Sequence, residues 1–164
     1  MEEVHMLSLD EFIPYRLAVA SESVSQLMAS QFRLEFNISL QEWRVLARLR
    51  EVTSLPQNLL AQQTFLDKVT VSRAAANLCR RRYLTRNVHM FDGRSHFLSL
   101  TQEGLNLADL LIERSRALEL EVLGDFCEDE RQILADCLRR LQVNAIRGNR
   151  PLTTSEKDRV LEPA

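Results

Sequence analysis

Apolar residues recur at steps of three and four along most of this chain, which is the spacing of one face of an α-helix. The first such stripe lies between residues 17 and 32, after Pro14, which suits the first turn of a helix. The stretch 8–11, Ser-Leu-Asp-Glu, has the form of a capping box ahead of it. We therefore predict a long helix that starts near Ile13 and stops at Asn37.

Capping signals divide the next part of the chain into shorter helices. Ser39 and Glu42 form a second capping box, and Pro56 suits the first turn of a third, short helix. Asp67 stands where an N-cap would open a fourth helix, which we expect to reach about Arg82. Apolar positions four and three residues apart predict one buried face on this fourth helix.

The period of the pattern changes after the fourth helix. Residues 83–89 and 95–100 are strand-like, and the Asp-Gly pair at 92–93 between them is a turn signal. These features predict a β-hairpin. Two short helices followed by a hairpin are the arrangement of a winged helix-turn-helix domain.

Long apolar stripes flank this predicted domain. We expect a long helix from Thr101 and a last helix from near Glu128, followed by a polar segment that is typical of a flexible tail. A long stripe without a partner in a small domain usually packs against another copy of the chain. We therefore predict a mainly α (α+β) fold: a winged helix-turn-helix region over 37–100, dimerisation helices over 8–36 and 101–146, and a tail over 147–164.

Composition limits the class of protein. The three cysteines, Cys79, Cys127 and Cys137, are too few and too widely spaced to indicate a disulfide framework or a Cys-x-x-Cys pair. Neither a signal peptide nor an apolar run long enough to span a membrane is visible, so we expect a cytoplasmic protein without a membrane partner. Cys137 lies on an apolar stripe, where we expect a core residue.

The charge is segregated along the chain. Residues 67–94 hold seven basic and two acidic residues, a net charge of +5, whereas the remainder carries −7 and the whole chain −2. Of the 21 basic residues 19 are Arg, whose planar guanidinium suits bidentate contacts to phosphate and guanine. A local patch of this size is sufficient for contact with double-stranded DNA.

The positions of the polar side chains suggest how DNA would be contacted. Val69 and Val71 cannot both face the core at a spacing of two, and we expect Val69 to be exposed. Short hydroxyl side chains let a helix sit deep in the major groove, and a wing Arg can enter the minor groove. The candidates on the fourth helix are Lys68, Val69, Thr70, Ser72 and Arg73; those on the wing are Asp92 and Arg94; those for phosphates are Gln57, Asn58, Arg80, Arg81 and Arg82.

Three segments make the chain resemble the MarR family of transcriptional regulators: LQEWRVLARL (40–49), DKVTVSRAAANLCRRRYLTR (67–86) and DGRSHFLSLTQEG (92–104). The resemblance extends over about residues 8–146. It implies a homodimer that binds a pseudo-palindromic operator, usually as a repressor released by a small molecule. It also implies that Asp92 and Arg94 are the wing pair. The Pro-Tyr-Arg-Leu start at 14–17 looks like regulators of aromatic catabolism, some of which sense acyl-CoA thioesters.

Two residues depart from the family pattern. Arg82 occupies a place where the family commonly has Gly, so either the turn differs or Arg82 adopts a strained left-handed backbone. Cys127 stands where Ser or Thr would cap the last helix, and we expect fraying there.

The resemblance also implies a crevice for an effector, an aromatic acid or its CoA thioester, between the dimer helices and the winged domain. Four residues on the bordering helices are candidates for lining it: Tyr15, Arg16, Phe36 and Trp43. Core packing would equally explain Tyr15 and Trp43.

Other chemistry finds little support. No motif for nucleotide binding, zinc binding or nucleophilic catalysis occurs, so we expect neither an enzyme nor a cofactor or metal. Two alternatives to a ligand-released repressor stay open. One is a protein-interaction module that has lost DNA binding; the other is a redox-sensing regulator in which the neighbouring arginines lower the pKa of Cys79.

Overall fold

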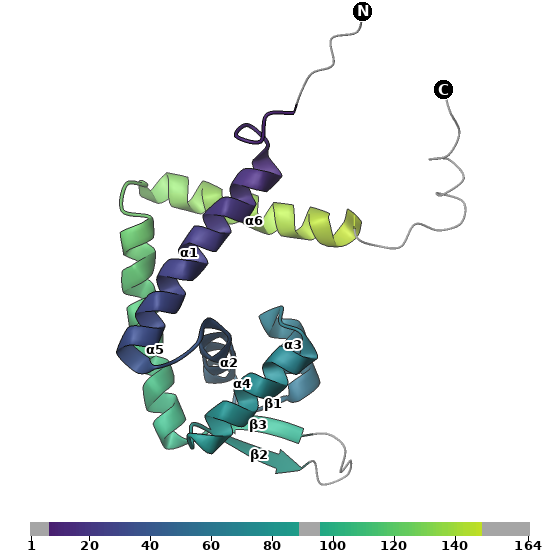
Figure 1. Ribbon diagram of the computed structural model, residues 1–164, viewed down its shortest axis with the longest axis vertical. Helices are drawn as coiled ribbons and strands as arrows, with labels where there is room; N and C mark the ends of the chain where they lie inside the picture. The colour runs from purple at the N-terminus through teal and green to yellow at the C-terminus, as the bar shows by residue number, and fades with distance from the viewer. Residues whose placement is uncertain (1–6, 89–95, 149–164) are drawn as a thin grey trace, which may run out of the picture. The chain divides into compact units, whose positions relative to one another are not determined.

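The computed structural model describes residues 7–88 and 96–148. The described residues up to Val122 form one compact unit, and those from Leu123 onward form a second. The mainly helical fold with a small antiparallel sheet is confirmed (Figure 1). In chain order the elements are α1 (Ile13–Phe36), α2 (Leu40–Glu51), β1 (Leu55–Pro56), α3 (Gln57–Thr64), α4 (Lys68–Arg80), β2 (Leu84–Val88), β3 (His96–Leu100), α5 (Gln102–Val122) and α6 (Glu128–Gly148).

Helix α1 has the predicted ends but not the predicted cap. It begins at Ile13 with Pro14 in its first turn, and Asn37 ends it in a left-handed conformation (φ 54°). The capping box expected from Ser8 was wrong, because Phe12 is the N-cap residue and makes no side-chain cap. The Ser8 carbonyl instead accepts the backbone N–H of Glu11 in a separate turn before the helix.

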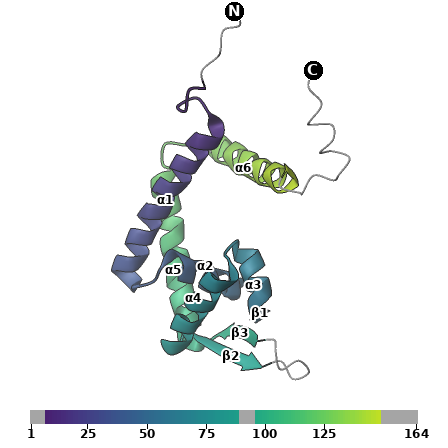
Figure 2. The same cartoon turned by 45° about the vertical axis from the view of Figure 1, so that its right-hand side comes forward.

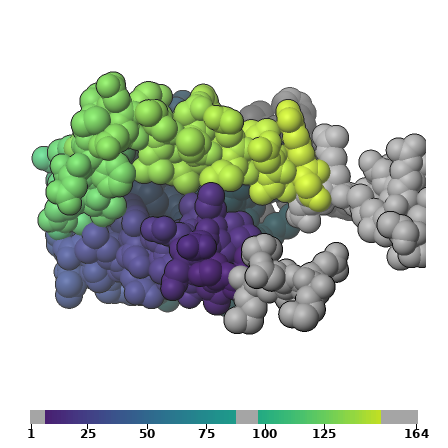
Figure 3. Space-filling view, turned by 90° about the horizontal axis from the view of Figure 1, so that it is seen from above, coloured from purple at the N-terminus to yellow at the C-terminus, as the bar shows by residue number. Residues whose placement is uncertain are grey.

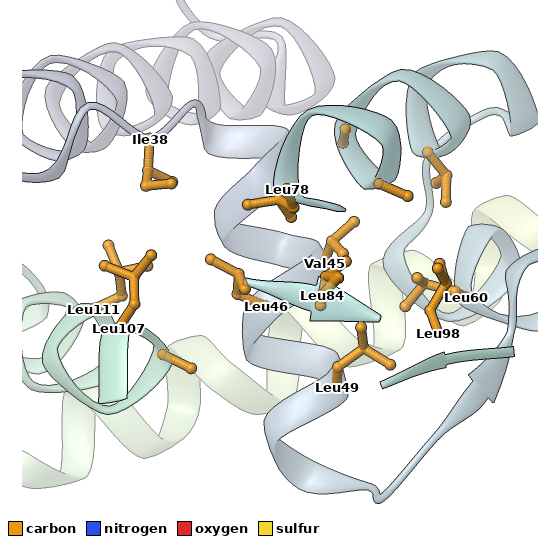
Figure 4. Close-up of a cluster of buried hydrophobic side chains, with 14 of the residues drawn as sticks. Ile38, Val45, Leu46, Leu49, Leu60, Leu78, Leu84, Leu98, Leu107 and Leu111 are labelled. Carbon is orange, nitrogen blue, oxygen red and sulfur yellow. The ribbon is translucent and has the colours of Figure 1, made fainter. Parts of the chain in front are cut away.

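Helix α2 is the centre of the first unit. Its predicted capping box is confirmed: the Glu42 backbone N–H donates to Ser39 Oγ (3.2 Å), and the Ser39 N–H donates to Glu42 Oε2 (2.8 Å). One face of α2 buries Val45, Leu46 and Leu49 completely or almost so. Around them converge side chains from α3, α4, β2, β3 and α5, which together form one core (Figure 4).

The sheet contains one strand more than the sequence predicts. Strands β2 and β3 pair antiparallel from Leu84 opposite Leu100 to Val88 opposite His96, as the hairpin prediction requires. Strand β1 then adds to the other edge of β3, with Leu55 opposite Leu98. A two-residue strand that ends in Pro56 is too short to show alternation, and an edge position is where a proline can be accommodated.

The start of α5 is held against the turn between α4 and β2. Thr101 caps α5, since its Oγ1 accepts the Gly104 N–H (3.0 Å) while donating to the Arg82 carbonyl (2.7 Å). The Thr101 N–H donates to the Tyr83 carbonyl (3.1 Å). Gly104 lies so close to Tyr83 that a Cβ there would be 2.0 Å from the Tyr83 oxygen. This contact explains why the position carries no side chain.

Helix α6 has no buried residue; one side of it is drawn in green to yellow in Figure 3. Its apolar stripe is correspondingly exposed, with Ile133 at 62% and Ile146 at 58%. Cys137 is exposed in this chain, so the expectation of a core cysteine was wrong for the single copy. At the start of the helix the Cys127 N–H donates to Glu130 Oε2 (2.8 Å), which supplies half of a capping box. The helix continues to Gly148, slightly past the predicted start of the tail, whose residues 149–164 lie outside the described residues.

Candidate nucleic-acid interface

Helices α3 and α4 form the predicted helix-turn-helix, and the β2–β3 hairpin follows α4 (Figure 2). The first turn of α4 is fixed by its N-cap, as predicted. Asp67 Oδ1 accepts the Thr70 N–H (2.8 Å), and Asp67 Oδ2 accepts the Thr70 hydroxyl (2.6 Å). Both hydrogen bonds lower the pKa of the Asp67 carboxyl, and the one from the Thr70 hydroxyl has the larger effect. The Thr70 hydroxyl thus donates its hydrogen within the chain, to Asp67. The side chain of the neighbouring Lys68 is exposed.

Helix α4 has two clearly different faces. Val71, Ala74, Ala75 and Leu78 are buried. Val69 is 59% exposed, which confirms that it, and not Val71, faces outward. The opposite face is a stripe at steps of four, three and four that we call the outer stripe of α4, and all of its members are exposed: Val69, Arg73, Ala76 and Arg80.

The outer stripe agrees only in part with the candidates chosen from sequence. Val69, Arg73 and Arg80 belong to it, whereas Ser72 lies at its border and is partly buried. Ala76 was not among the predicted contact residues. Counting seven residues on from Val69 would have found it, because that step returns to the same face of a helix. Because the side chain of Ala76 is small, it projects less from the helix than Arg73 and Arg80 on either side of it.

The three consecutive arginines at the end of α4 serve different purposes. Helix α4 ends at Arg80, two residues before the predicted end. The Arg81 guanidinium donates to the carbonyl oxygens of Asn37 (2.8 Å) and Phe36 (3.4 Å) and stacks 5.0 Å from the Tyr83 ring centroid. Arg81 thus neutralises the negative end of α1. Its guanidinium is therefore occupied within the chain.

Arg82 resolves one alternative left open by the sequence. Its φ is 63°, so the chain keeps the left-handed turn that glycine commonly makes and places an arginine in it. A non-glycine residue in this region costs about 1–2 kcal/mol. The side chain is exposed, next to the start of the hairpin. The turn therefore holds a strained residue that carries a positive charge to the surface.

The remaining candidates lie on α3 and the hairpin. Arg86 on β2 donates to the Gln57 side-chain carbonyl (3.0 Å), which ties the strand to the first residue of α3. Asn58 beside it is exposed. Arg86 belongs to the basic block but was not predicted as a contact. The wing candidates Asp92 and Arg94 lie outside the described residues.

The charge of the described interface is concentrated in α4 and β2. Residues 67–88 hold six basic residues and one acidic residue, a net charge of +5. The single acid, Asp67, is engaged in capping α4. The surface formed by the outer stripe and its neighbours is therefore basic, as contact with a polyanion requires.

The four effector candidates do not form one site within this chain. Phe36 and Trp43 lie where α1 meets α2, and the Trp43 ring packs 5.4 Å from that of Phe32. Tyr15 and Arg16 are exposed some twenty residues earlier on the same helix, about 30 Å away at the rise of an α-helix. Trp43 Nε1 is buried without an acceptor among the described residues.

A separate cleft of about 270 Å³ lies between α1 and the start of α2, and none of these four residues lines it. Its lining includes Arg33 from α1 and Ser39 at the cap of α2.

The cysteine prediction needs a correction. Partial burial raises the pKa of the Cys79 thiol, and the charge of Arg86 only partly counteracts this. Arg80, Arg81 and Arg82 therefore do not produce the activated thiolate that the sequence suggested. Within residues 7–88 and 96–148, no group of three His, Cys, Asp or Glu side chains could hold a metal ion. No helix in the same ranges is both long and apolar enough to cross a membrane.

Comparison with known proteins supports the same interpretation of this region. Residues 36–95 match the model of the MarR family. A probable transcriptional regulator from Pseudomonas aeruginosa has a similar structure, with a TM-score of 0.74 and 26% identity over 82% of this chain and 99% of that one. No curated protein matches the chain at a significant level. The chain therefore has the winged-helix fold of MarR-type transcriptional regulators.

Two further similar structures concern ligands. The PcaV transcriptional regulator from Streptomyces coelicolor, solved with its natural ligand, has a TM-score of 0.72 and 24% identity over 87% of this chain and 99% of that one. BpsR from Bordetella bronchiseptica, whose DNA binding is regulated by 6-hydroxynicotinic acid, has a TM-score of 0.77 and 18% identity over 84% and 97%. At these identities both show similarity of fold.

Proposed function

We propose that this chain is a transcriptional regulator of the MarR family that binds double-stranded DNA in the cytoplasm, with α4 as its recognition helix. One observation carries the proposal: the face of α4 turned away from the core is an exposed stripe of Val69, Arg73, Ala76 and Arg80 within a block of net charge +5. The arginines suit guanine edges and phosphates, and Val69 suits a thymine methyl group.

Binding to DNA is tested by fluorescence anisotropy with a duplex from the promoter beside its own gene. Affinity should fall steeply as salt rises, because each phosphate contact releases counterions. Arg73→Ala and Arg94→Ala should each weaken binding by about 1–3 kcal/mol without lowering the melting temperature. Arg116→Ala is the matched control, since Arg116 is an exposed arginine on α5, outside the basic block. Lack of binding at low salt by the folded protein would refute the proposal.

We further propose that the functional species is a homodimer. The apolar side chains exposed on this chain cluster near its two ends: on α1 and the turn before it they include Leu9, Ile13 and Val19, and on α6 they include Ile133 and Ile146. A second copy is the simplest cover for apolar stripes of this length. A dimer would place two recognition helices roughly 34 Å apart, one turn of DNA. Sedimentation equilibrium tests this, and a monomer at micromolar concentration would refute it.

The proposed effector is a small aromatic acid or its CoA thioester, which would release the protein from DNA as a repressor. The regulation of BpsR by an aromatic acid supports this class of ligand for the present chain. The Trp43 N–H, which has no acceptor in the described part of the chain, also supports it, because a buried donor without an acceptor costs about 1–3 kcal/mol that a ligand oxygen could recover. A thermal-shift series with aromatic acids, their CoA thioesters and aliphatic acids of equal charge tests it, since a ligand raises the melting temperature by mass action.

A further inference from the structure

Glu42 is a carboxylate in an unusual position. The residue is only 4% exposed. Within the described part of the chain, Thr64 is the one other buried polar residue. Thr64 donates its hydroxyl to a carbonyl of its own helix, whereas Glu42 links two helices. Its Oε2 accepts the Ser39 N–H of the capping box, and its Oε1 accepts the side-chain amide of Asn77 on α4. Both of its oxygens are therefore hydrogen-bonded.

Asn77 continues the chain of hydrogen bonds outward. It lies at the border between the buried face and the outer stripe of α4 and is partly buried. While its Nδ2 donates to Glu42, its Oδ1 accepts from the Arg80 guanidinium. A carboxylate can only accept and a guanidinium can only donate, so the amide between them has a single satisfactory orientation. The three side chains form a relay that runs from the buried core of α2 to the outer stripe.

We propose that Glu42 and Asn77 are positioning residues that hold Arg80 in the conformation in which it contacts DNA. This inference rests on the function proposed above. An arginine side chain loses rotamer freedom when it binds, and the relay removes part of that loss beforehand. Neither Glu42 nor Asn77 needs to touch DNA for this. Arg73 is exposed like Arg80 but has no corresponding tether among the described residues, whereas Arg80 donates to Asn77.

The polarity of the relay provides a specific test. In Glu42→Gln the new amide oxygen can keep the Ser39 N–H, so its NH2 group then faces Asn77. Asn77 must rotate its amide to accept from Gln, which turns its own NH2 group toward the Arg80 guanidinium. Two donors then meet and Arg80 is released. Asn77→Ala removes the relay without altering the capping box and serves as a second variant if Glu42→Gln folds poorly.

A double substitution should restore the relay. In Glu42→Gln/Asn77→Asp the aspartate accepts both from the glutamine amide and from the Arg80 guanidinium. The protein keeps its total number of carboxylates, so its net charge equals that of the wild type. Asn77→Asp alone places two carboxylates together, and their repulsion disturbs the relay. We therefore expect this single variant to bind DNA more weakly than the wild type. Rescue of two defective single variants by their combination is an outcome that general damage to the fold does not produce.

The first measurement is affinity for the promoter duplex. We expect Glu42→Gln and Asn77→Ala to bind roughly tenfold more weakly and the double variant to bind within about twofold of the wild type. In an Arg80→Gln background, Glu42→Gln should cause no further loss, because the side chain through which it acts is gone. An equal loss in that background, or absence of rescue, overturns the proposal.

The second measurement separates this proposal from the proposed function. In the free protein, NMR of the Arg80 guanidinium should show slow rotation and resolved Nη signals in the wild type and the double variant. The signals should average in Glu42→Gln and Asn77→Ala, and Arg80→Gln identifies them. Averaged signals in the wild type overturn the relay. Failure of the wild type to bind any duplex overturns the function instead, and the NMR result then decides on the relay by itself.

Discussion

The contact between Gly104 and Tyr83 leads to a quantitative prediction for Gly104→Ala. The added Cβ would be 2.0 Å from the Tyr83 oxygen, 2.9 Å from its carbonyl carbon and 3.3 Å from Leu100 Cδ2. An ordinary carbon–oxygen contact is roughly 3.3 Å, so α5 and the chain before β2 must separate by about 1.3 Å. Because the obstacle is backbone and not a flexible side chain, it cannot move aside alone.

The magnitude follows from what that separation breaks. Overpacking of a tight contact costs about 1–3 kcal/mol. The hydrogen bonds from Thr101 to the carbonyls of Tyr83 and Arg82 cross the same gap, and each contributes about 1 kcal/mol. Alanine recovers about 1 kcal/mol through its higher helix propensity. The net loss in free energy of unfolding should be about 2–4 kcal/mol.

Urea unfolding at a fixed protomer concentration measures this loss. Gly148→Ala is the matched control, because no described residue lies within 4 Å of the Cβ position at the last residue of α6. It should leave stability unchanged or raise it slightly. If Gly104→Ala proves as stable as the wild type while the control behaves as expected, the packing argument for the start of α5 is wrong.

Three further predictions follow from particular residues. Arg82→Gly should raise the free energy of unfolding by about 0.5–1 kcal/mol, since relief of the left-handed strain exceeds the entropic cost of the extra flexibility that glycine gives the unfolded chain. The same substitution should weaken DNA binding. Thermal unfolding checks the first outcome and fluorescence anisotropy the second. The pKa of Asp67 is lowered on folding, so its carboxylate contributes stability above the unfolded pKa of about 3.9 and loses it as the pH falls through the folded value. The wild type should therefore have a higher free energy of unfolding than Asp67→Ala at neutral pH, and this difference should disappear in acid. Denaturant titration at successive pH values measures it. Burial raises the pKa of the Cys79 thiol, whereas Cys127 is exposed, so iodoacetamide should modify Cys127 before Cys79. Peptide mass spectrometry of the native protein measures the order of modification. The reverse order would reopen a redox role for Cys79.

Local signals in the sequence predicted most of the element boundaries. The capping box at Ser39 and the N-cap at Asp67 were correct, because their hydrogen bonds form between residues three apart. The same pattern at Ser8 failed. With Pro14 in the first turn the helix starts at Ile13, too late for Ser8 to cap it. Strand β1 was missed because its pairing with β3 depends on residues more than forty positions away.

The candidate site was predicted at the level of elements and less well at the level of side-chain roles. Helical spacing was enough to orient Val69 and Val71. It could not indicate that Arg81 binds carbonyls at the end of α1, or that Asn77 joins Glu42 to Arg80, since both depend on how α4 packs against other helices. Cys79 was misjudged for the same reason: burial, which the sequence does not display, outweighs the nearby positive charge.

The central position of α2 has a consequence for how the protein opens. Helix α2 packs against α1, α3, α4, α5 and β3, and its inward face is fully buried. Partial unfolding that frees α4 must therefore also expose the inner face of α2, whereas α6, which has no fully buried residue, can unravel at little cost in the single chain. Amide hydrogens of α2 and α4 should then exchange together and last. Helix α4 would be lost only in an almost global event, so the proposed regulator would be either competent or unfolded, with few half-ordered forms between these states.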